Sequence, residues 1–377
     1  MATNFWGRYR DVQPTTHFDP LQTFIEEDHP VGFRVNFMPD RGKRPREQHI
    51  PLPKSFLQND ITEEEITKSP LYRVLHGQEP AVPLAGDDEV LGDPSDDEVI
   101  QDFSHYKGIS IMNKFSPLGL YSKQAAGVAM VNFPSSYTRT LDRPQLNFDL
   151  LRPMRTSLRY LMEGKGYRTD LKTPLVFFNI GPSSGASLRY IHGQSYAIPR
   201  AEGLNSYAYQ KAFESNVSCL TCKIATQDEV TDHLGQVINY EELTVWEDEN
   251  VRVIYPYAPL RTMGTRIIPK VHVDYLGSVS DSLLMSLATA LSVADYLMNA
   301  AVPATRRVRM DRTIPFRQTT SIGKDFHMFI DLLPPFPLVA AETVDFLGMT
   351  PFRPTSVAER MKRIPVDHLL HHNNHSS

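Results

Sequence analysis

Cysteine is almost absent from this sequence, with two in 377 residues. Two cysteines cannot form a disulfide framework, which excludes the small disulfide-stapled folds. An excess of basic charge is missing as well, because 39 Lys and Arg face 44 Asp and Glu and the formal net charge is −5. A general nucleic-acid-binding protein normally presents a basic field, so we expect no nucleic-acid partner.

Long apolar runs are also lacking. No stretch approaches the ~18 consecutive apolar residues that a membrane span needs, and the beginning, Met1-Ala2-Thr3-Asn4, is not typical of a secretory signal. We therefore expect a cytoplasmic protein without a membrane partner. What the sequence does have is ample apolar content for a core, 41%, and a length that allows one large or two medium domains.

The most informative stretch combines a β-rich run with a glycine- and serine-rich loop. Leu175 to Phe178 is followed by the loop Asn179 to Ser187 and then by His192-Gly193-Gln194. Glycines let a backbone come close to a ligand, and small hydroxyl side chains add donors for phosphate oxygens. An imidazole held against such a loop is well placed to attack phosphorus. The alternative is a strand, a loop and a surface histidine with no catalytic role.

These residues resemble the active-site signature of the galactose-1-phosphate uridylyltransferase family, a branch of the histidine-triad superfamily. The matching positions are Asn179, Gly181, Gly185, Ser187, His192, Gly193 and Gln194. The resemblance implies that His192 becomes covalently nucleotidylated. It also implies that Gln194 and Ser187 stabilise the phosphate oxygens, and that Asn179 and the two loop glycines, Gly181 and Gly185, contribute to substrate binding.

Other segments resemble substrate-binding motifs of this family. The basic turn Met38 to Pro45 is similar to a segment that supplies arginines to the nucleotide phosphates, and Arg41 and Arg44 occupy those positions. His17 to Leu21 resembles the motif that precedes it. Forked guanidinium groups suit a diphosphate better than ammonium groups do, although the turn alone is also typical of a solvated loop. Asn113 lies in a segment similar to the one that lines the base and ribose pocket.

Cys219 and Cys222 form a Cys-x-x-Cys pair. The pair is compatible with a redox dithiol, with two unrelated buried cysteines, or with half of a tetrahedral zinc site that needs two more ligands, normally histidines. A redox pair usually opens a helix after a buried strand, and we do not expect that setting here. His272 and His327 match positions where relatives carry histidines. The resemblance implies one structural metal site, with zinc as the metal and iron as the alternative, at Cys219, Cys222, His272 and His327.

Family members often carry another metal site in their first half, and this chain cannot build it. No further cysteine is present, and Tyr137 and Tyr190 stand at the two matching histidine positions. Tyrosine fills a similar volume and forms hydrogen bonds, so the loop can stay ordered without a metal. In the second half, Phe329 replaces the second histidine of the strand motif that contains His327.

The expected elements repeat in layout. They are a strand from 109, strands at 128–133 and 171–180 and a helix at 150–162, then strands at 245–248, 251–254, 265–269 and 326–333 and a helix at 282–301. Strands separated by a single long helix favour an α+β fold over a doubly wound sheet. We predict two tandem histidine-triad-like units, each an antiparallel half-barrel packed with helices. A catalytic unit would span 1–205, and a metal-binding unit 206–377.

Four remaining segments carry structural expectations. Residues 1–70 are rich in proline and charge and show no helical period. Residues 86–102 are acidic but lack the glycine of a calcium loop, which favours a flexible insertion without a ligand. Ser356 to Glu359 has a capping-box pattern that predicts a closing helix. The histidine-rich tail at 368–375 is expected to be frayed.

The expected function is nucleotidyl transfer through a covalent intermediate on His192. The substrates would be a nucleotide sugar or dinucleotide and a phosphate acceptor. Uridylyl transfer to galactose 1-phosphate, adenylyl transfer from ADP-glucose and dinucleoside tetraphosphate phosphorolysis all occur on this scaffold, so the base, the sugar and the acceptor stay open. The alternatives are a phosphorylase or hydrolase, and a degenerate member that binds nucleotide without turnover. A homodimer is also left open.

Overall fold

The computed structural model describes most of the chain. The described residues are 15–26, 29–37, 62–114, 116, 118, 127–166, 168–181, 184–200, 204–216, 218–232, 235–301, 311–334, 347–350 and 352–370. At 15–18, 22–26, 29–37, 204–207 and 347–350 the description covers the backbone alone. Arg41 and Arg44 lie outside the described residues, so their predicted roles stay predictions.

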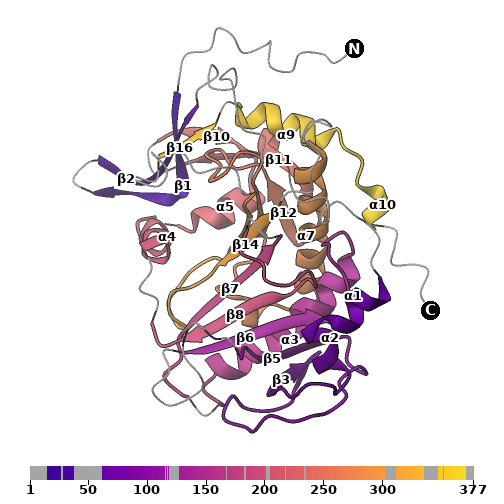
Figure 1. The fold of residues 1–377 in the computed structure, drawn as a ribbon. Coiled ribbons are helices and arrows are strands. Elements are labelled where there is room, and N and C mark those ends of the chain that lie inside the picture. The colour runs from indigo at the N-terminus through magenta and orange to yellow at the C-terminus, as the bar shows by residue number, and fades with distance from the viewer. Residues whose placement is uncertain are drawn as a thin grey trace.

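An antiparallel sheet of 11 strands organises the described part of the chain (Figure 1). Its order is β11-β12-β13-β15-β14-β7-β8-β6-β5-β3-β4. The strands are β3 (Pro83–Gly86), β4 (Glu89–Val90), β5 (Gly108–Met112), β6 (Val128–Pro134), β7 (Thr173–Ile180), β8 (Gly193–Ile198), β11 (Thr244–Glu247), β12 (Val251–Ile254), β13 (Thr265–Pro269), β14 (Arg312–Arg317) and β15 (Phe329–Leu332). The sheet and its covering helices confirm the predicted α+β class.

Smaller sheets and the helices complete the described architecture. The smaller sheets are β1 (Thr15–Glu26), β2 (His29–Phe37) and β16 (Leu347–Thr350), and β9 (Glu229–Thr231) with β10 (Val237–Asn239). The helices are α1 (Glu63–Lys68), α2 (Pro70–Leu75), α3 (Pro144–Met162), α4 (Leu204–Glu214), α5 (Leu220–Thr226), α6 (Tyr240–Leu243), η5 (Leu276–Ser278), α7 (Asp281–Ala301), α9 (Pro354–Lys362) and α10 (Asp367–Leu370).

The same element order occurs twice along the large sheet. Three strands, one long helix and two strands appear as β3, β5, β6, α3, β7, β8 and again as β11, β12, β13, α7, β14, β15. In both sets the last strand lies between the third and the fourth, which gives β3-β5-β6-β8-β7 and β11-β12-β13-β15-β14. The two repeats meet where β7 pairs with β14. The sheet is continuous across them, so the domain boundary at 205/206 stays a prediction.

The long helices α3 and α7 pack against each other and against the sheet. Met154 and Leu158 of α3 and Leu287 and Leu291 of α7 are at most 1% exposed and belong to the main core. The helix α3 begins at Pro144, earlier than the predicted start, because proline suits the first helical turn and apolar spacing does not mark it. Burying these apolar faces is the main stabilising contribution to the fold.

The helix α7 is long and apolar enough to cross a membrane by length and composition. However, 72% of its most apolar window is buried inside the protein. It packs against α3, α9, β12 and β13. Its apolar character is therefore explained by its place as the core helix of the second repeat.

Two expectations about local structure are wrong, and one predicted helix begins earlier than expected. The acidic segment is not loose over its first part, because β3 and β4 form a hairpin there and Asp88 lies 2.7 Å from Arg155 of α3. The helix α1 lies within the first 70 residues, and Thr62 caps it. The predicted closing helix is present as α9, but it begins at Pro354, two residues before the capping-box residue Ser356. In the tail, His368 lies in α10 and packs on Tyr296, and later residues lie outside the described part.

Candidate nucleotidyl site and metal site

The glycine- and serine-rich loop joins two neighbouring strands of the first repeat. It connects β7 to β8, whose pairing includes Phe178 opposite Gly193. Gly181 and Gly185 have φ of +84° and +82°, in the left-handed region that favours glycine. The amides of Ser184 and Ala186 both lie 3.2 Å from the carbonyl oxygen of Gly181 and close the turn. The loop glycines thus shape the backbone between the two strands.

Two polar side chains of this loop that were predicted to act at the site, Asn179 and Ser187, have different surroundings. With its amide turned to donate, Asn179 lies 3.3 Å from the carbonyl oxygens of Phe178 and Ser184. Ser187 is exposed. The structure therefore gives Asn179 a contact within the loop, while Ser187 remains accessible to a ligand.

His192 is buried directly before β8, with 6% of its surface exposed. Its Nδ1 lies 2.8 Å from the carbonyl oxygen of Tyr190. A carbonyl only accepts, so Nδ1 carries the proton and Nε2 keeps its lone pair in the neutral ring. Burial lowers the pKa of His192 below its ordinary value, against a smaller opposing effect of the carbonyl. The neutral, nucleophilic form is therefore favoured.

Gly193 lets β8 pack closely on the helix behind it. A Cβ at this position would lie 2.3 Å from Met154 Cε and 3.0 Å from the Phe178 ring. The absence of a side chain therefore allows the strand that follows His192 to rest against α3. This role in packing explains the glycine between the histidine and Gln194.

Gln194 projects from the face of the sheet opposite α3. Burial alternates along β7 and β8, and Val176 and Phe178 point into the core. Phe177, on the other face, is the register partner of Gln194. The hydroxyl of Tyr196 donates to Gln194 Oε1 at 3.0 Å, which leaves the amide NH2 as the donor group of this side chain.

Asn113, directly after β5, is half-buried, and its contact with a nucleotide stays a prediction.

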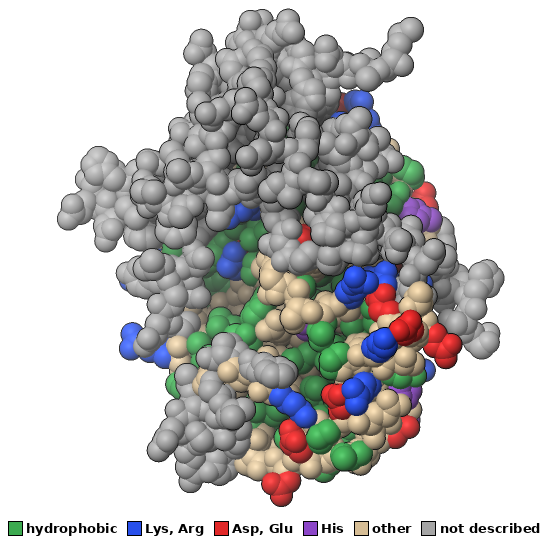
Figure 2. All heavy atoms as spheres, viewed as in Figure 1, with side chains coloured by type: hydrophobic (Ala, Val, Ile, Leu, Met, Phe, Trp, Pro, Cys, Tyr) green, Lys and Arg blue, Asp and Glu red, His purple; other side chains and the backbone are tan. Residues whose placement is uncertain are grey.

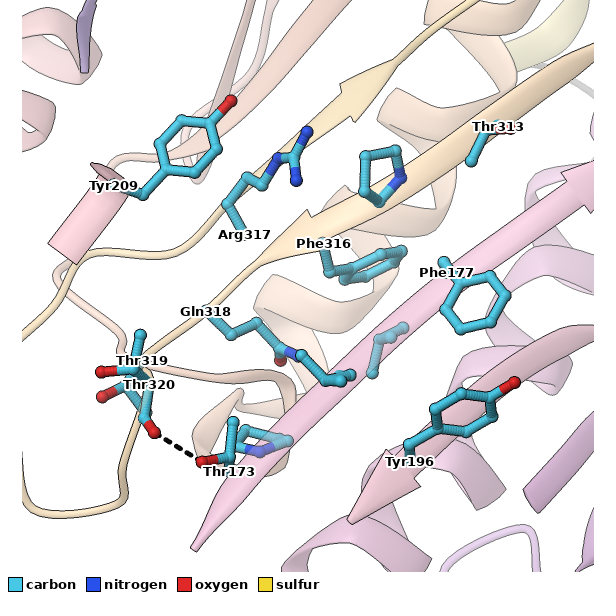
Figure 3. A pocket seen from close by; sticks show the side chains of 14 residues that line it. Thr173, Phe177, Tyr196, Tyr209, Thr313, Phe316, Arg317, Gln318, Thr319 and Thr320 are labelled. Carbon is cyan, nitrogen blue, oxygen red and sulfur yellow. Dashed lines mark hydrogen bonds between the residues drawn. The ribbon is translucent and has the colours of Figure 1, made fainter. Parts of the chain in front are cut away.

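A pocket of about 280 Å³ opens on the same face, over β7, β8 and β14. Figure 3 shows Phe177 and Tyr196 at one end and Arg317 and Tyr209 at the other. The rings of Phe177 and Tyr196 meet edge to face at 5.2 Å, and the Arg317 guanidinium lies over the Tyr209 ring at 4.7 Å. Because Phe177 pairs with Gln194, the pocket adjoins the strand that carries the candidate catalytic amide.

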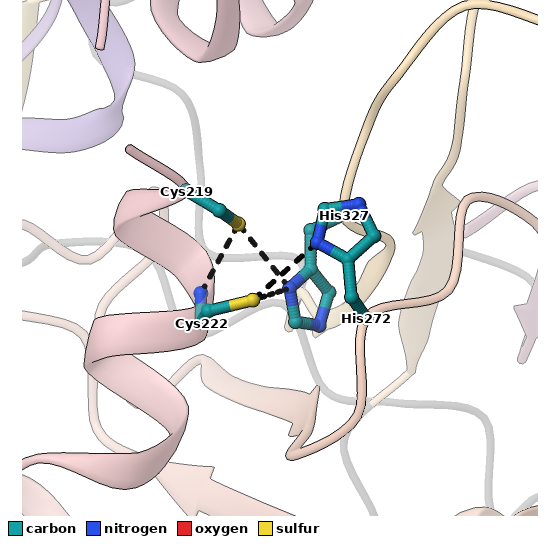
Figure 4. Close-up of side chains that lie close together, drawn as sticks. All are labelled: Cys219, Cys222, His272 and His327. Carbon is teal, nitrogen blue, oxygen red and sulfur yellow. Dashed lines mark hydrogen bonds between the residues drawn. The ribbon is translucent and has the colours of Figure 1, made fainter. Parts of the chain in front are cut away.

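The second repeat brings together the four predicted metal ligands (Figure 4). One ligand atom from each of Cys219, Cys222, His272 and His327 lies within 4.8 Å of all the others. Cys222 Sγ is 3.4 Å from His272 Nδ1 and 3.2 Å from His327 Nδ1. Tetrahedral zinc with Zn–S of about 2.3 Å and Zn–N of about 2.0 Å places such atoms roughly 3.5 Å apart. The cluster therefore fits a tetrahedral metal ion.

Other groups orient both imidazoles so that Nδ1 faces the cluster. Nε2 of His272 lies 2.9 Å from Asp325 Oδ1, and Nε2 of His327 lies 3.0 Å from the Pro269 carbonyl oxygen. These acceptors fix the proton on Nε2 and leave the Nδ1 lone pair for a metal. Burial lowers the pKa of His327 to about 4, which keeps it in the neutral form that binds metals.

The cysteine pair opens a helix, contrary to the sequence interpretation. Cys219 caps α5, and its Sγ accepts from the Cys222 amide at 3.3 Å. A position at a helix start also suits a redox dithiol. Burial, however, raises the pKa of the Cys219 thiol to about 12, so a reactive thiolate is disfavoured without a bound cation. The two imidazoles beside the thiols favour metal binding.

Sequence reasoning missed several residues that complete these sites. Asp325 and Tyr196 contact predicted site residues, and Glu65 accepts from Tyr137 and Arg139 near the His192 loop. Asp325 stands two residues before His327, and an acid so close to a ligand is a usable signal for an orienting partner. Glu65 lies far from the loop in sequence and has no such signal.

The segment His17 to Leu21, which resembles a family motif, contains Asp19, and this residue makes a structural contact. Asp19, which is 1% exposed, accepts from Arg266 at 2.9 Å, and Arg266 also contacts Asp331 at 2.7 Å. This buried network ties β1 to β13 and β15.

Figure 2 shows Lys and Arg side chains interspersed with Asp and Glu on the face drawn.

Comparisons with solved structures define the class of fold. An ADP-glucose phosphorylase from Arabidopsis thaliana, solved with bound ADP-glucose, aligns with a TM-score of 0.68 at 17% identity over 94% of this chain and 99% of that one. A GalT-like protein from Arabidopsis thaliana aligns with a TM-score of 0.64 at 15% identity, over 94% and 100%. A uridylyltransferase aligns with a TM-score of 0.56 at 17% identity, over 68% and 85%. The fold is that of these proteins.

A comparison with curated proteins finds a relative by sequence similarity. The galactose-1-phosphate uridylyltransferase of Thermotoga maritima is 26% identical over 211 residues, which is 52% of this chain and 62% of that protein. The match therefore spans less than two thirds of the relative. No protein-family model matches the chain. Together with the fold, this relative confirms the resemblance that the sequence motifs indicated.

Proposed function

We propose that this chain is a nucleotidyltransferase that works through a covalent nucleotidyl-His192 intermediate. It would move a nucleoside monophosphate between a nucleotide sugar and a sugar 1-phosphate or inorganic phosphate. The observation that carries the proposal is the 2.8 Å contact between His192 Nδ1 and the Tyr190 carbonyl oxygen. This contact keeps the lone pair on Nε2, and a neutral imidazole with that lone pair is a nucleophile for phosphorus.

Transfer would proceed in two displacements. In the first, a bond forms between Nε2 of His192 and the α-phosphorus, and the bond from that phosphorus to the bridging oxygen breaks. The leaving sugar phosphate takes the oxygen and the electron pair. In the second, a phosphate oxygen of the acceptor attacks the same phosphorus, and the P–N bond breaks and returns its electron pair to Nε2. The proton stays on Nδ1, and the Tyr190 carbonyl oxygen that accepts it stabilises the positive charge that develops on the ring.

Other residues would bind the phosphates. The amide NH2 of Gln194 and the hydroxyl of Ser187 would donate to the non-bridging oxygens as charge builds on them. Arg41 and Arg44 would pair with the donor diphosphate. The pocket beside Phe177 adjoins Gln194 and offers a place for the part of the donor that does not react.

The metal cluster would have a structural role. We propose zinc, with iron as the alternative, bound by Cys219, Cys222, His272 and His327. The support is the donor set and the spacing of its atoms. A metal would supply folding energy there, because it draws together ligands from three separate segments of the chain, the start of α5, the loop after β13 and the loop before β15.

The named relatives include uridylyltransferases and an ADP-glucose phosphorylase, so both kinds of acceptor need testing. Intact-mass spectrometry after incubation with UDP-glucose, ADP-glucose or a dinucleoside tetraphosphate, without acceptor, should show the mass of one nucleoside monophosphate added. His192→Ala should show none. Adding galactose 1-phosphate to one sample and inorganic phosphate to another should identify the acceptor by loss of the adduct.

The same experiment decides against the proposal in two ways. An adduct that persists in His192→Ala would place the nucleophile elsewhere. Nucleotide binding without any adduct across the panel would favour the other class, a protein that binds nucleotide without turnover.

A further inference from the structure

The first repeat reproduces the geometry of the metal cluster with different side chains. Tyr137 lies three residues after the end of β6, as His272 lies three residues after the end of β13. Tyr190 and His327 both lie shortly before the last strand of their repeat. The Tyr137 and Tyr190 rings are 4.7 Å apart at 46°, and the His272 and His327 rings are 4.9 Å apart at 51°. The two tyrosines therefore occupy the places of the two histidines.

The polar atoms of Tyr190 and His327 that point away from the neighbouring ring contact equivalent backbone atoms. Nε2 of His327 lies 3.0 Å from the carbonyl oxygen of Pro269, the last residue of β13. The hydroxyl of Tyr190 donates to the carbonyl oxygen of Pro134, the last residue of β6. Each contact joins the loop before the last strand to the end of the third strand.

A backbone hydrogen bond is repeated beside each pair of rings. The amide of Ile191 donates to the carbonyl of Thr138 at 2.8 Å, and the amide of Met328 donates to the carbonyl of Val273, also at 2.8 Å. Each donor directly follows the second ring, and each acceptor directly follows the first. The correspondence therefore extends to the main chain.

The helix start that supplies the two cysteines has a counterpart as well. Cys219 caps α5 and its Sγ accepts from the amide of Cys222 at 3.3 Å. Thr62 caps α1 and its Oγ1 accepts from the amide of Glu65 at 3.2 Å. In the second repeat the Cys222 sulfur contacts His272, and in the first repeat the Glu65 carboxylate accepts a hydrogen bond from the Tyr137 hydroxyl in the same way. Thr62 and Glu65 thus stand where the second repeat has its thiols.

The carboxylate of Glu65 is neutralised by arginines. Arg139 Nε lies 2.7 Å from Glu65 Oε1, and Arg189 lies 3.4 Å from Oε2. Arg139 is two residues from Tyr137, and Arg189 directly precedes Tyr190. In the first repeat the positive charge of the Arg139 guanidinium thus lies beside Glu65. In the second repeat the thiols at the corresponding positions are available to bind a metal cation.

We propose that Thr62, Glu65, Tyr137, Tyr190 and Arg139 form a metal-free cluster that replaces, position by position, the metal site of the second repeat. We further propose that Tyr190 is a positioning residue for His192, a part that rests on the proposed function. The Tyr190 ring and hydroxyl are held by Tyr137 and Pro134. This holds the Tyr190 carbonyl in place, and that carbonyl orients His192.

The correspondence is tested by building a metal site, without measuring activity. A variant with Thr62→Cys, Glu65→Cys, Tyr137→His and Tyr190→His should bind one more zinc per chain than the wild type, measured by elemental analysis. The matched control carries Thr62→Cys, Glu65→Cys and Tyr190→His but keeps Tyr137, and it should gain no tightly bound zinc. A folded fourfold variant with the zinc content of the wild type would overturn the correspondence.

The positioning role is tested with a conservative variant. Tyr190→Phe keeps the ring but removes the contact with Pro134, and the single-turnover rate of adduct formation should fall at least about tenfold because His192 is misplaced, with donor affinity unchanged. Tyr255→Phe is the control, since it removes a hydroxyl that is equally buried in the second repeat. A rate within twofold of the wild type for Tyr190→Phe would overturn the role. Absence of an adduct in the wild type would refute the proposed function and leave the zinc result standing.

Discussion

His192 Nδ1 and the main-chain carbonyl of Tyr190 lie 2.8 Å apart, so the backbone of one residue selects the reactive nitrogen of the other. In the second repeat the corresponding position holds Phe329, which is 1% exposed and lies two residues after His327, as His192 lies two residues after Tyr190. The first repeat thus retains a histidine without a metal cluster beside it. The second retains the cluster of metal ligands without that histidine.

The metal content of the purified protein should be about one zinc or iron per chain. Cys219→Ser should lower the free energy of unfolding by several kcal/mol, because binding of the metal is coupled to folding. Ser218→Ala, at an exposed neighbouring position, should leave both quantities unchanged. Elemental analysis and denaturant unfolding check this, and a metal-free protein of unchanged stability would contradict it.

Asp325→Asn should weaken metal binding while all four ligands stay in place. Asp325 accepts from Nε2 of His272 at 2.9 Å, and loss of such an orienting partner typically lowers metal affinity about 10- to 100-fold. Competition with a chromophoric chelator measures the change. Asp367→Asn, an acid remote from the cluster at the start of α10, is the control. Equal affinity for Asp325→Asn and wild type would show that His272 is oriented by other contacts.

Adduct formation should remain efficient below the usual pKa of histidine. Burial lowers the pKa of His192, so its neutral form persists as the pH falls through about 6.5. Protonation would block the Nε2 lone pair only at lower pH. The single-turnover rate plotted against pH should have its acid midpoint below 6.5. A midpoint at or above this value would mean that His192 is more solvated in solution than in the structure.

Buried His192 should also link stability to pH with a definite sign. The unfolded chain binds the proton more readily than the folded chain, so the contribution of this group to stability is present above about pH 6.5 and is lost as the pH falls below it. His192→Gln should reduce this part of the pH dependence of unfolding. An unchanged slope between the variant and the wild type would contradict it.

The loop glycines should differ in how badly they tolerate alanine. Gly181 and Gly185 both have positive φ, a strain of roughly 1–2 kcal/mol for an L-residue. A Cβ at Gly181 would also come within 1.9 Å of the Asp311 side chain, whereas Gly185 faces open space. Gly181→Ala should therefore destabilise more than Gly185→Ala in thermal unfolding. Gly164→Ala, with similar φ and open space after α3, should match Gly185→Ala in stability but spare adduct formation.

Sequence patterns were sufficient where the determining forces are local. The strand at Thr265–Pro269, the hairpin around 248–250 and the helix at Asp281–Ala301 follow from apolar periodicity within a few turns of chain. The four metal ligands were also predictable, because the cysteines stand three residues apart and the family resemblance supplied the histidines. Both kinds of information lie in the order of residues alone.

Only the tertiary structure decided which distant segments meet. The strand β14 lies beside β7 at the centre of the sheet, and Glu65 lies beside Tyr137 and Arg139, yet neither placement leaves a local pattern. Such contacts depend on the packing of two whole repeats and on charge neutralisation between segments far apart in the chain. The sequence by itself determined which side chains are available for chemistry, and the folded sheet decided which carbonyl orients His192 and what surrounds it.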